Sequence, residues 1–238
     1  MNLFTEAFYT LLYKPLFNIL ILLYQFLPWN DFGIAVIMLT VLLRIFLLPF
    51  TAQSIRSQKA ISEIQPKIQE IQEKFKEDQE KQAQEMMNLY KEKNINPFTI
   101  FLPMLVQLPL FIALFQVFSR GLRSEEMVSL YSFVPHPGQI NYTFLGLISL
   151  SQASLLIALI AAVVQFIQLK TQTKPEKAKR NNTKSFSVFG QKQMPYFFLA
   201  FTFLFLSKLP AALGLYWITT SLFSIGQQYV IENYDKKR

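Results

Sequence analysis

Five long apolar stretches constrain the fold of this chain more strongly than any other feature of its sequence. A helix needs about 20 apolar residues to cross the hydrocarbon core of a bilayer, and each stretch approaches or exceeds that length. With 52% hydrophobic and 15% aromatic residues, the chain is also too apolar for an ordinary soluble domain. We therefore predict an all-α integral membrane protein whose core transmembrane helices lie at about 32–54, 97–118, 145–169, 193–208 and 210–231, the last four within 97–231.

Basic residues are distributed very unevenly over the segments that connect these stretches. Eighteen of the 23 Lys and Arg residues lie in segment 55–96, in loop 170–192 and in the C-terminal tail, 232–238. Because Lys and Arg are retained on the cytoplasmic side of a membrane, we predict that these three segments are cytoplasmic. Five spans then place residue 31 on the opposite side, which makes the N-terminus extracytoplasmic.

An apolar N-terminal stretch, residues 3–27, carries a narrow polar stripe whose members recur at intervals of four and seven residues. Such a stripe favours an amphipathic helix that lies in the outer interface of the membrane, within an extracytoplasmic segment 1–31. A sixth span is the alternative, and it would change nothing downstream. We predict no cleavable signal peptide, because a basic start and a small-residue cleavage site are both missing. The stripe consists of Glu6, Thr10, Lys14, Asn18 and Gln25.

Segment 55–96 is charged but neutral overall, with eight basic and eight acidic residues. Apolar residues recur three or four positions apart along its first half, and the pattern resumes weakly at Met86, Leu89 and Tyr90. We predict a mobile cytoplasmic helical hairpin that is either a solvated spacer or a docking device for a partner. Pro66 is compatible with the first helix only near its first turn or at a kink. The repeat is formed by Ile61, Ile64, Ile68, Ile71 and Phe75.

Loop 170–192 is strongly basic, with seven Lys and Arg residues against the single acid Glu176. Such a loop could bind anionic lipid head groups or RNA phosphates. The alternative is that its charge only fixes the membrane topology. Because the positive charge of the chain follows this topology, we expect no specific DNA binding.

Arg44 lies in the middle of the first apolar stretch, about 15 Å from either membrane surface. A charged side chain at that depth costs roughly 2.5–3.5 kcal/mol on insertion scales, so something must solvate it. No acidic residue occurs within any of the apolar stretches. The candidates are a water-filled cavity, backbone and Gln groups of neighbouring helices, or an anionic group of a substrate. The alternative is a structural Arg that is hydrogen-bonded to carbonyls.

Polar residues inside the apolar stretches are the candidates for the surroundings of Arg44. Thr40 lies four residues before Arg44 and therefore on the same face of the helix. One Gln in a membrane helix usually serves packing, but several together with an unpaired Arg favour a hydrated cavity. The polar set comprises Thr40, Gln53, Gln107, Gln165, Gln168, Gln227, Tyr216 and Trp217.

The residue inventory argues against covalent and metal chemistry. The chain has no Cys and a single His, His136. It contains neither a Ser–His–Asp or paired-carboxylate arrangement nor a glycine-rich phosphate loop. We therefore expect no enzyme activity, no metal site, no cofactor and no small-molecule substrate.

Short strings that are weak individually occur in a fixed order along nearly the whole chain. They are Phe32-Gly33, Thr40-Val41-Leu42-Leu43-Arg44-Ile45-Phe46-Leu47-Leu48-Pro49-Phe50, Ser57-Gln58-Lys59, Ile64-Gln65-Pro66, Leu89-Tyr90-Lys91, Asn94-Ile95-Asn96-Pro97, Leu102-Pro103-Met104-Leu105-Val106-Gln107-Leu108-Pro109-Leu110-Phe111, Leu209-Pro210-Ala211-Ala212-Leu213-Gly214-Leu215-Tyr216-Trp217 and Gln227-Gln228.

This ordered set resembles the YidC/Oxa/Alb family of membrane protein insertases, in its short bacterial form. The resemblance implies five core helices around a hydrophilic groove that is open to the cytoplasm and to lipid but closed on the outside. Arg44 matches the family's groove arginine, and Thr40 and Trp217 match positions that flank the groove or contact the substrate. Gln107, and one of Gln165 or Gln168, match less closely.

The resemblance also implies an amphipathic outer helix before the first core span, in agreement with the interfacial interpretation of 3–27. The chain departs from larger members of the family, because it has no large extracytoplasmic domain and no long basic C-terminal tail. Contact with a ribosome would therefore have to use loop 170–192 or the charged hairpin.

The resulting hypothesis is an insertase and chaperone of the bacterial plasma membrane that inserts and folds nascent membrane proteins through a hydrated groove containing Arg44. Its partners would be nascent membrane proteins and the lipid bilayer, with the ribosome and the Sec translocon as further candidates. The alternative is a small-anion transporter or channel in which Arg44 binds the permeating anion. A scaffold that folds partner helices, with a structural Arg44, is the third hypothesis.

Overall fold

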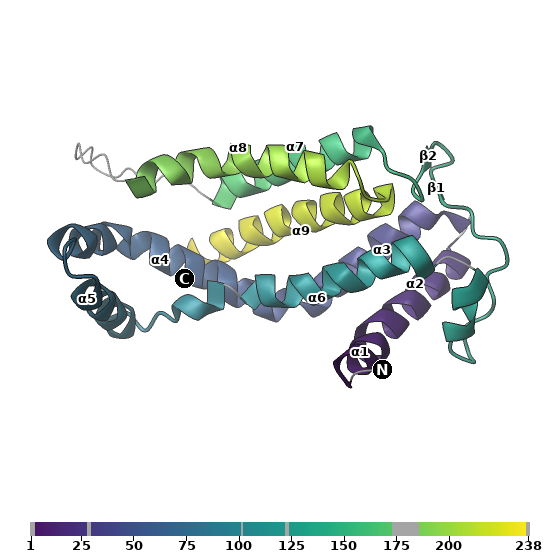
Figure 1. Ribbon diagram of the computed structural model, residues 1–238, viewed down its shortest axis with the longest axis horizontal. Coiled ribbons are helices and arrows are strands. Elements are labelled where there is room, and N and C mark those ends of the chain that lie inside the picture. Colours follow the sequence, from purple (N-terminus) through teal and green to yellow (C-terminus); the bar gives the residue numbers. More distant parts are fainter. Residues whose placement is uncertain (1–2, 28–29, 101, 122–123, 173–185, 237–238) are drawn as a thin grey trace. The chain divides into compact units, whose positions relative to one another are not determined.

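The computed structural model describes residues 3–27, 30–100, 102–121, 124–172 and 186–236 (Figure 1). Helices make up nearly all of the regular structure in these residues, and this confirms the predicted all-α class. The exception is one antiparallel pair, β1 (Thr143–Phe144) and β2 (Ile148–Ser149). The helical elements are α1 (Leu3–Phe8), η1 (Tyr9–Tyr13), α2 (Lys14–Phe26), α3 (Phe32–Phe46), α4 (Leu48–Lys74), α5 (Gln79–Glu92), η3 (Pro97–Ile100), α6 (Leu102–Gln116), η4 (Val117–Gly121), η5 (Ser124–Ser129), α7 (Leu155–Gln172), α8 (Phe186–Leu206) and α9 (Ala211–Lys236).

The chain divides into two compact units. The first contains α2, α3, α7, α8 and most of α6 and α9, and the second contains α4 and α5. Unit 1 comprises Met1–Phe46, Gln107–Thr173 and Lys184–Gly226, and unit 2 comprises Leu47–Val106, Lys174–Thr183 and Gln227–Arg238.

By length and composition, three helices among the described residues can cross a membrane: Thr5–Phe26, Pro97–Ser119 and Leu155–Gln172. The number rises to four if α3 and α4, which meet at a bend, count as one broken span. The apolar part of α8, Gln193–Leu206, is shorter. The N-terminal stretch that the polar stripe assigns to the interface is thus long and apolar enough to span.

Leu47 interrupts the helix that the sequence predicts over 32–54. The helix α3 ends at Phe46, and α4 begins at Leu48 with Pro49 in its first turn. Proline lacks the N–H that a continuous helix requires, and its ring clashes with the carbonyl four residues earlier. Arg44 therefore lies in the last turn of α3 and not in the middle of an unbroken helix.

The stretch predicted as a span from residue 145 becomes helical only at Leu155. The residues before it form the β1–β2 hairpin, whose tip holds Leu145 and Gly146 at φ values of 53° and 69°. The buried Asp31 joins this hairpin to α3. One of its carboxylate oxygens accepts the N–H of Ile34 at 2.9 Å, and the other accepts the N–H of Leu145 at 2.6 Å. A single carboxylate thus caps α3 and fixes the hairpin to it.

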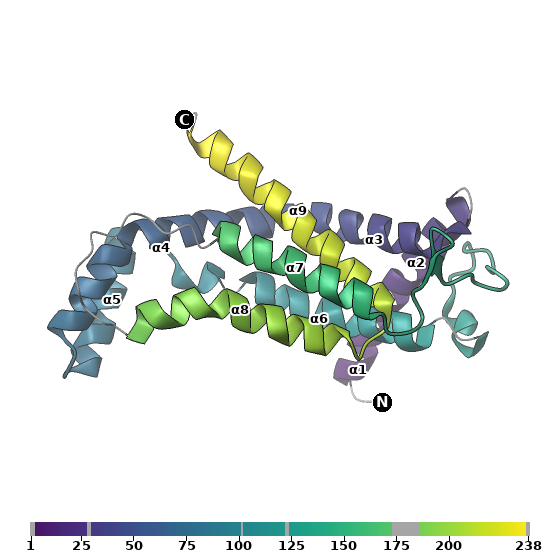
Figure 2. The same ribbon diagram turned by 90° about the horizontal axis from the view of Figure 1, so that it is seen from above.

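The N-terminal ends of α3, α7 and α9 meet at this hairpin (Figure 1). At the start of α9, the N–H groups of Ala211 and Ala212 donate to the carbonyls of Gln152 and Leu150, at 2.8 and 3.1 Å. Gln152 lies just before the start of α7. The three helices therefore run in the same direction from one end of unit 1. A fourth helix of this unit, α8, packs side by side with α7 (Figure 2).

Two members of the N-terminal polar stripe bind the last residue of η5 and the segment that follows it. Asn18 is buried; its amide nitrogen donates to the carbonyl of Ser129 at 3.1 Å, and its oxygen accepts the N–H of Tyr131 at 2.7 Å. Gln25 donates to the carbonyl of Pro135 at 2.6 Å. The stripe therefore meets protein backbone at these two positions, which the amphipathic pattern alone does not reveal.

In unit 2, α4 and α5 pack around a small apolar core formed by Ile64, Ile68 and Leu89. Asp78 caps α5 by accepting the N–H of Lys81 at 3.0 Å. Pro66 lies well inside α4, which continues through it, so Pro66 does not mark a first turn. The core is extended by partly buried Ile61, Ile71, Met86, Tyr90 and Ile95.

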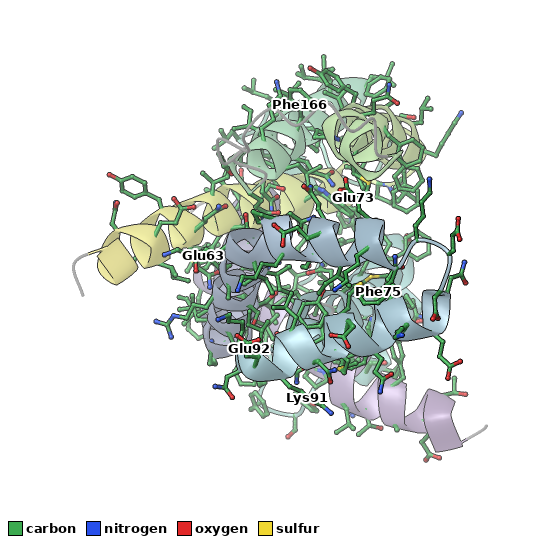
Figure 3. All side chains as sticks on the ribbon, turned by 90° about the vertical axis from the view of Figure 1, so that its left-hand side faces the viewer. Glu63, Glu73, Phe75, Lys91, Glu92 and Phe166 are labelled. Atoms are coloured by element: carbon green, nitrogen blue, oxygen red, sulfur yellow. The ribbon has the colours of Figure 1, made fainter. Side chains whose placement is uncertain are left out.

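Charged side chains cover the outside of this helix pair (Figure 3). Glu63 and Glu73 are exposed on α4, as are Lys91 and Glu92 on α5. The neighbouring Lys93 ammonium lies 3.1 Å from the Glu92 carboxylate and lowers the pKa of Glu92. A solvated surface over a thin core agrees with the weak apolar pattern of the sequence.

The helix α8 begins at Phe186, within the loop predicted over 170–192. Residues 173–185 lie outside the described residues, so the predictions that concern lipid head groups and RNA phosphates stay predictions.

The close packing of Gly33 against the hairpin generates a stability prediction. A Cβ at Gly33 would lie 2.6 Å from Cγ of Phe144, and nothing lies within 4 Å of a Cβ at Gly226. We expect Gly33→Ala to destabilise the protein by about 1–3 kcal/mol, because the Phe144 ring must move. Thermal unfolding in detergent measures this cost. Gly226→Ala is the matched control and should leave the midpoint unchanged or raise it, since alanine favours helix; equal midpoints for the two variants would contradict the packing argument.

Candidate functional site

A chain of hydrogen bonds to uncharged side chains holds Arg44 inside unit 1. Its Nη2 donates to Oε1 of Gln107 on α6 at 3.1 Å, and Nε2 of Gln107 donates to the hydroxyl of Tyr216 on α9 at 2.5 Å. Arg44 is half-buried, and Tyr216 is buried. Three helices that are distant in sequence thus contribute one polar side chain each.

A second group of hydrogen bonds centres on Gln165 of α7. Its Oε1 accepts Nε1–H of Trp217 on α9 at 2.9 Å and the hydroxyl of Thr202 on α8 at 2.5 Å. Thr202 is buried, whereas Gln165 and Trp217 are partly buried. Gln165 therefore joins α7, α8 and α9 through one carbonyl oxygen.

The two groups of hydrogen bonds are linked because Tyr216 and Trp217 are consecutive on α9. Phe111 of α6 packs against the Trp217 indole in a T-shaped arrangement, with ring centroids 5.9 Å apart. On its other side, Phe111 lies 5.8 Å from the ring of Phe205 on α8. We call the two hydrogen-bonded groups together the polar network; its members are Arg44, Gln107, Tyr216, Trp217, Gln165 and Thr202.

Two of the residues that the sequence singles out have other partners. Thr40 is buried, and its hydroxyl donates at 2.6 Å to the carbonyl of Val36 in its own helix. Threonine hydroxyls in helices commonly donate to the carbonyl four residues earlier in this way. At Gln168 the described contact is made by the main-chain carbonyl, which accepts from Thr171 at 2.7 Å. The structure thus selects Gln165 over Gln168 as the partner of Trp217.

The remaining polar candidates, Gln53 and Gln227, belong to unit 2. Gln227 donates to the hydroxyl of Thr51 on α4 at 2.7 Å. Gln53 and Arg56 line a cavity of about 500 Å³ together with Asn94 in the connection after α5. These side chains therefore contribute to unit 2 and do not enter the polar network.

Arg44 has no partner of opposite charge among the described residues. Its hydrogen-bond acceptor Gln107 is neutral, and no acidic side chain in the described part of the chain forms an ion pair with Arg44. A carboxylate 4 Å from the guanidinium would gain about 4 kcal/mol of Coulomb attraction at an effective dielectric constant near 20. The site can thus attract an anionic group, and no group of three metal-ligating side chains accompanies it in the described residues.

The sequence reasoning missed Thr202 and Phe111. A lone threonine in an apolar helix usually bonds its own backbone, as Thr40 does, so nothing in the pattern distinguishes Thr202. Phe111 is one of 24 phenylalanines, and only its position between α8 and α9 makes it part of the site.

The apolar helices and the polar side chains that join them define a polytopic helical membrane protein. A family model described as "60Kd inner membrane protein" matches residues 22–238, nearly the whole chain. The chain therefore belongs to this family, the YidC/Oxa/Alb family to which its motifs point, and is a multi-pass bacterial membrane protein.

Curated relatives bear the name membrane protein insertase YidC. The protein from Cellvibrio japonicus is 34% identical over 218 residues, which cover 92% of this chain and 35% of that protein. The protein from Clostridium tetani is 30% identical over 210 residues, or 88% of this chain and 86% of that protein. The chain thus spans about a third of the length of the first relative and most of the second.

The choice of Gln165 over Gln168 generates a second prediction. Gln165→Leu leaves the Trp217 N–H and the Thr202 hydroxyl without their acceptor, at a cost of about 1–3 kcal/mol for each buried donor. We expect a lower unfolding midpoint together with a blue shift of Trp217 fluorescence, measured in a Trp29→Phe background. Gln168→Leu is the matched control and should leave both readouts nearly unchanged. The reverse ranking would remove Gln165 from the polar network.

Proposed function

We propose that this chain is a membrane protein insertase that receives hydrophilic segments of nascent membrane proteins at the polar network around Arg44. The observation that supports this most is the half-buried Arg44, whose described side-chain partners are Gln107 and Tyr216 and include no carboxylate. Relatives named membrane protein insertase YidC support the same activity. The proposed arrangement is five core helices around a hydrophilic groove that opens to the cytoplasm.

The physical task of such a site is to lower the cost of moving polar groups through hydrocarbon. A polar group without a partner costs several kcal/mol in an apolar medium, and a charge costs far more. Amide and hydroxyl groups at Gln107, Gln165 and Tyr216 would offer exchangeable hydrogen bonds to the passing segment. Arg44 would attract its acidic groups, and the apolar part of the substrate would then partition sideways into lipid.

The charged hairpin, segment 55–96, would receive the substrate on the cytoplasmic side. Its small core of Ile64, Ile68 and Leu89 favours mobility, and its exposed charges suit contact with hydrophilic chain segments. In this proposal the C-terminus is cytoplasmic and the N-terminus extracytoplasmic. The ribosome and the Sec translocon are candidate partners, through the charged hairpin or loop 170–192.

Removal of the charge at Arg44 should affect substrates selectively. For substrates with acidic translocated ends we expect Arg44→Ala to lower insertion about tenfold, which corresponds to ~1.4 kcal/mol. Arg44→Lys should retain more activity, because it keeps the charge but not the geometry of the guanidinium. Insertion into proteoliposomes, followed by protease protection of the translocated end, measures the effect.

Two comparisons separate this proposal from its rivals. Lys208→Ala removes the same charge from the exposed turn between α8 and α9, outside the polar network, and should insert acidic substrates normally. Substrates with neutral translocated ends should depend little on Arg44. Equal insertion by wild type and Arg44→Ala would reject the electrostatic role, and anion flux through the purified protein that is lost in Arg44→Ala would favour the transporter.

The location of the substrate can be tested separately by photocrosslinking to a stalled single-span nascent chain. We expect crosslinks from probes that replace Arg44, Gln107 and Trp217, and their loss when the chain is released. Leu42 is the control, because it lies two residues from Arg44, roughly 200° around the helix, and is 48% exposed. Crosslinks from Leu42 alone would place the substrate outside the polar network.

A further inference from the structure

The tip of the β1–β2 hairpin exposes two large apolar side chains. Leu145 is 60% exposed and Leu147 is 85% exposed, on either side of Gly146. Hairpin turns ordinarily carry Gly, Asn or Asp, which tolerate positive φ and are polar or small. Two leucines at such a tip need an apolar surrounding that the described contacts within the chain do not supply.

Leu145 is moreover held in a backbone conformation that bulky residues rarely adopt. Its φ is 53°, in the left-handed region. The buried Asp31 carboxylate maintains this conformation by accepting the Leu145 N–H at 2.6 Å. The structure therefore presents leucine at a strained position that glycine or asparagine would occupy more easily, and it fixes the direction in which the tip projects.

The hairpin is attached at the end of unit 1 where membrane helices begin. Its Phe144 packs on Gly33 in the first turn of α3. Phe144 also lines an apolar cavity of about 490 Å³ with Ile157 of α7 and Leu215 of α9. The base of the hairpin is thus continuous with apolar surfaces of helices near their N-terminal ends.

We propose that Leu145 and Leu147 insert into the lipid interface at the membrane surface where α3, α7 and α9 begin. The hairpin then anchors this end of unit 1 at a fixed depth, as interfacial apolar side chains do elsewhere. Lipid is favoured over a protein partner because Leu155 and Leu156, which begin α7, are 66% and 57% exposed and extend the apolar surface into the membrane helix. The inference depends on the membrane location of these helices and not on insertase activity.

The absence of cysteine from the chain permits a direct test with single spin labels. Leu147→Cys and Gln139→Cys are labelled with a nitroxide and reconstituted into vesicles of phosphatidylethanolamine and phosphatidylglycerol. Gln139 is the matched control, since it is an exposed polar residue of the same connecting segment. Power-saturation EPR then measures collisions with oxygen, which concentrates in lipid, and with a neutral nickel chelate, which stays in water.

We expect the label at position 147 to show an oxygen-to-nickel collision ratio several-fold higher than the label at position 139. Equal, water-like ratios at the two positions would overturn the proposal. Protection of the 147 label from both reagents would overturn it as well, because it would show that protein covers the tip. Since Leu147 is largely exposed, its replacement should not unfold the protein, and circular dichroism of the labelled variant verifies this.

Discussion

The hydrogen bond from Arg44 to Gln107 is the interaction on which the rest of the polar network depends. It satisfies one donor of a guanidinium while leaving its charge uncompensated, because an amide contributes dipole and no charge. Gln107 can hold this position because its amide nitrogen donates a hydrogen bond to the hydroxyl of Tyr216. A carboxylate in place of Gln107 would neutralise Arg44 more effectively, and it would also remove the attraction for an anionic group from elsewhere.

Two prolines interrupt the helices on either side of this interaction. Pro49 ends the straight course of α3, so that Arg44 occupies a last helical turn, where a positive charge is also favoured by the helix dipole. Pro109 lies inside α6, two residues after Gln107, and it removes a backbone donor from that helix. Arg44 and Gln107 thus lie close to prolines that interrupt the backbone hydrogen bonds of their helices, and in a membrane the freed backbone groups need water or side chains as partners.

Much of the fold could be predicted from the sequence, because apolar length and periodicity report directly on membrane spans and helix faces. The repeat of Ile61, Ile64, Ile68 and Ile71 identified the core of the α4–α5 pair. The break at Leu47 and the hairpin before α7 were missed, because an apolar run conceals both a proline-induced break and short strands. Within the site, Arg44 was evident from its charge, whereas the choice between Gln165 and Gln168 and the role of Thr202 required knowledge of which side chains meet in space.

The contacts of Asn18 have a consequence for how this protein can diverge. Asn18 binds main-chain groups of Ser129 and Tyr131, and Gln25 binds the carbonyl of Pro135. These partners are two main-chain carbonyls and one N–H, which every amino acid except proline carries. The connecting segment can therefore accept many changes of side chain during evolution, but an insertion or deletion between residues 129 and 135 would change the spacing between the partners of Asn18 and Gln25. Length, more than composition, is what natural selection should preserve there.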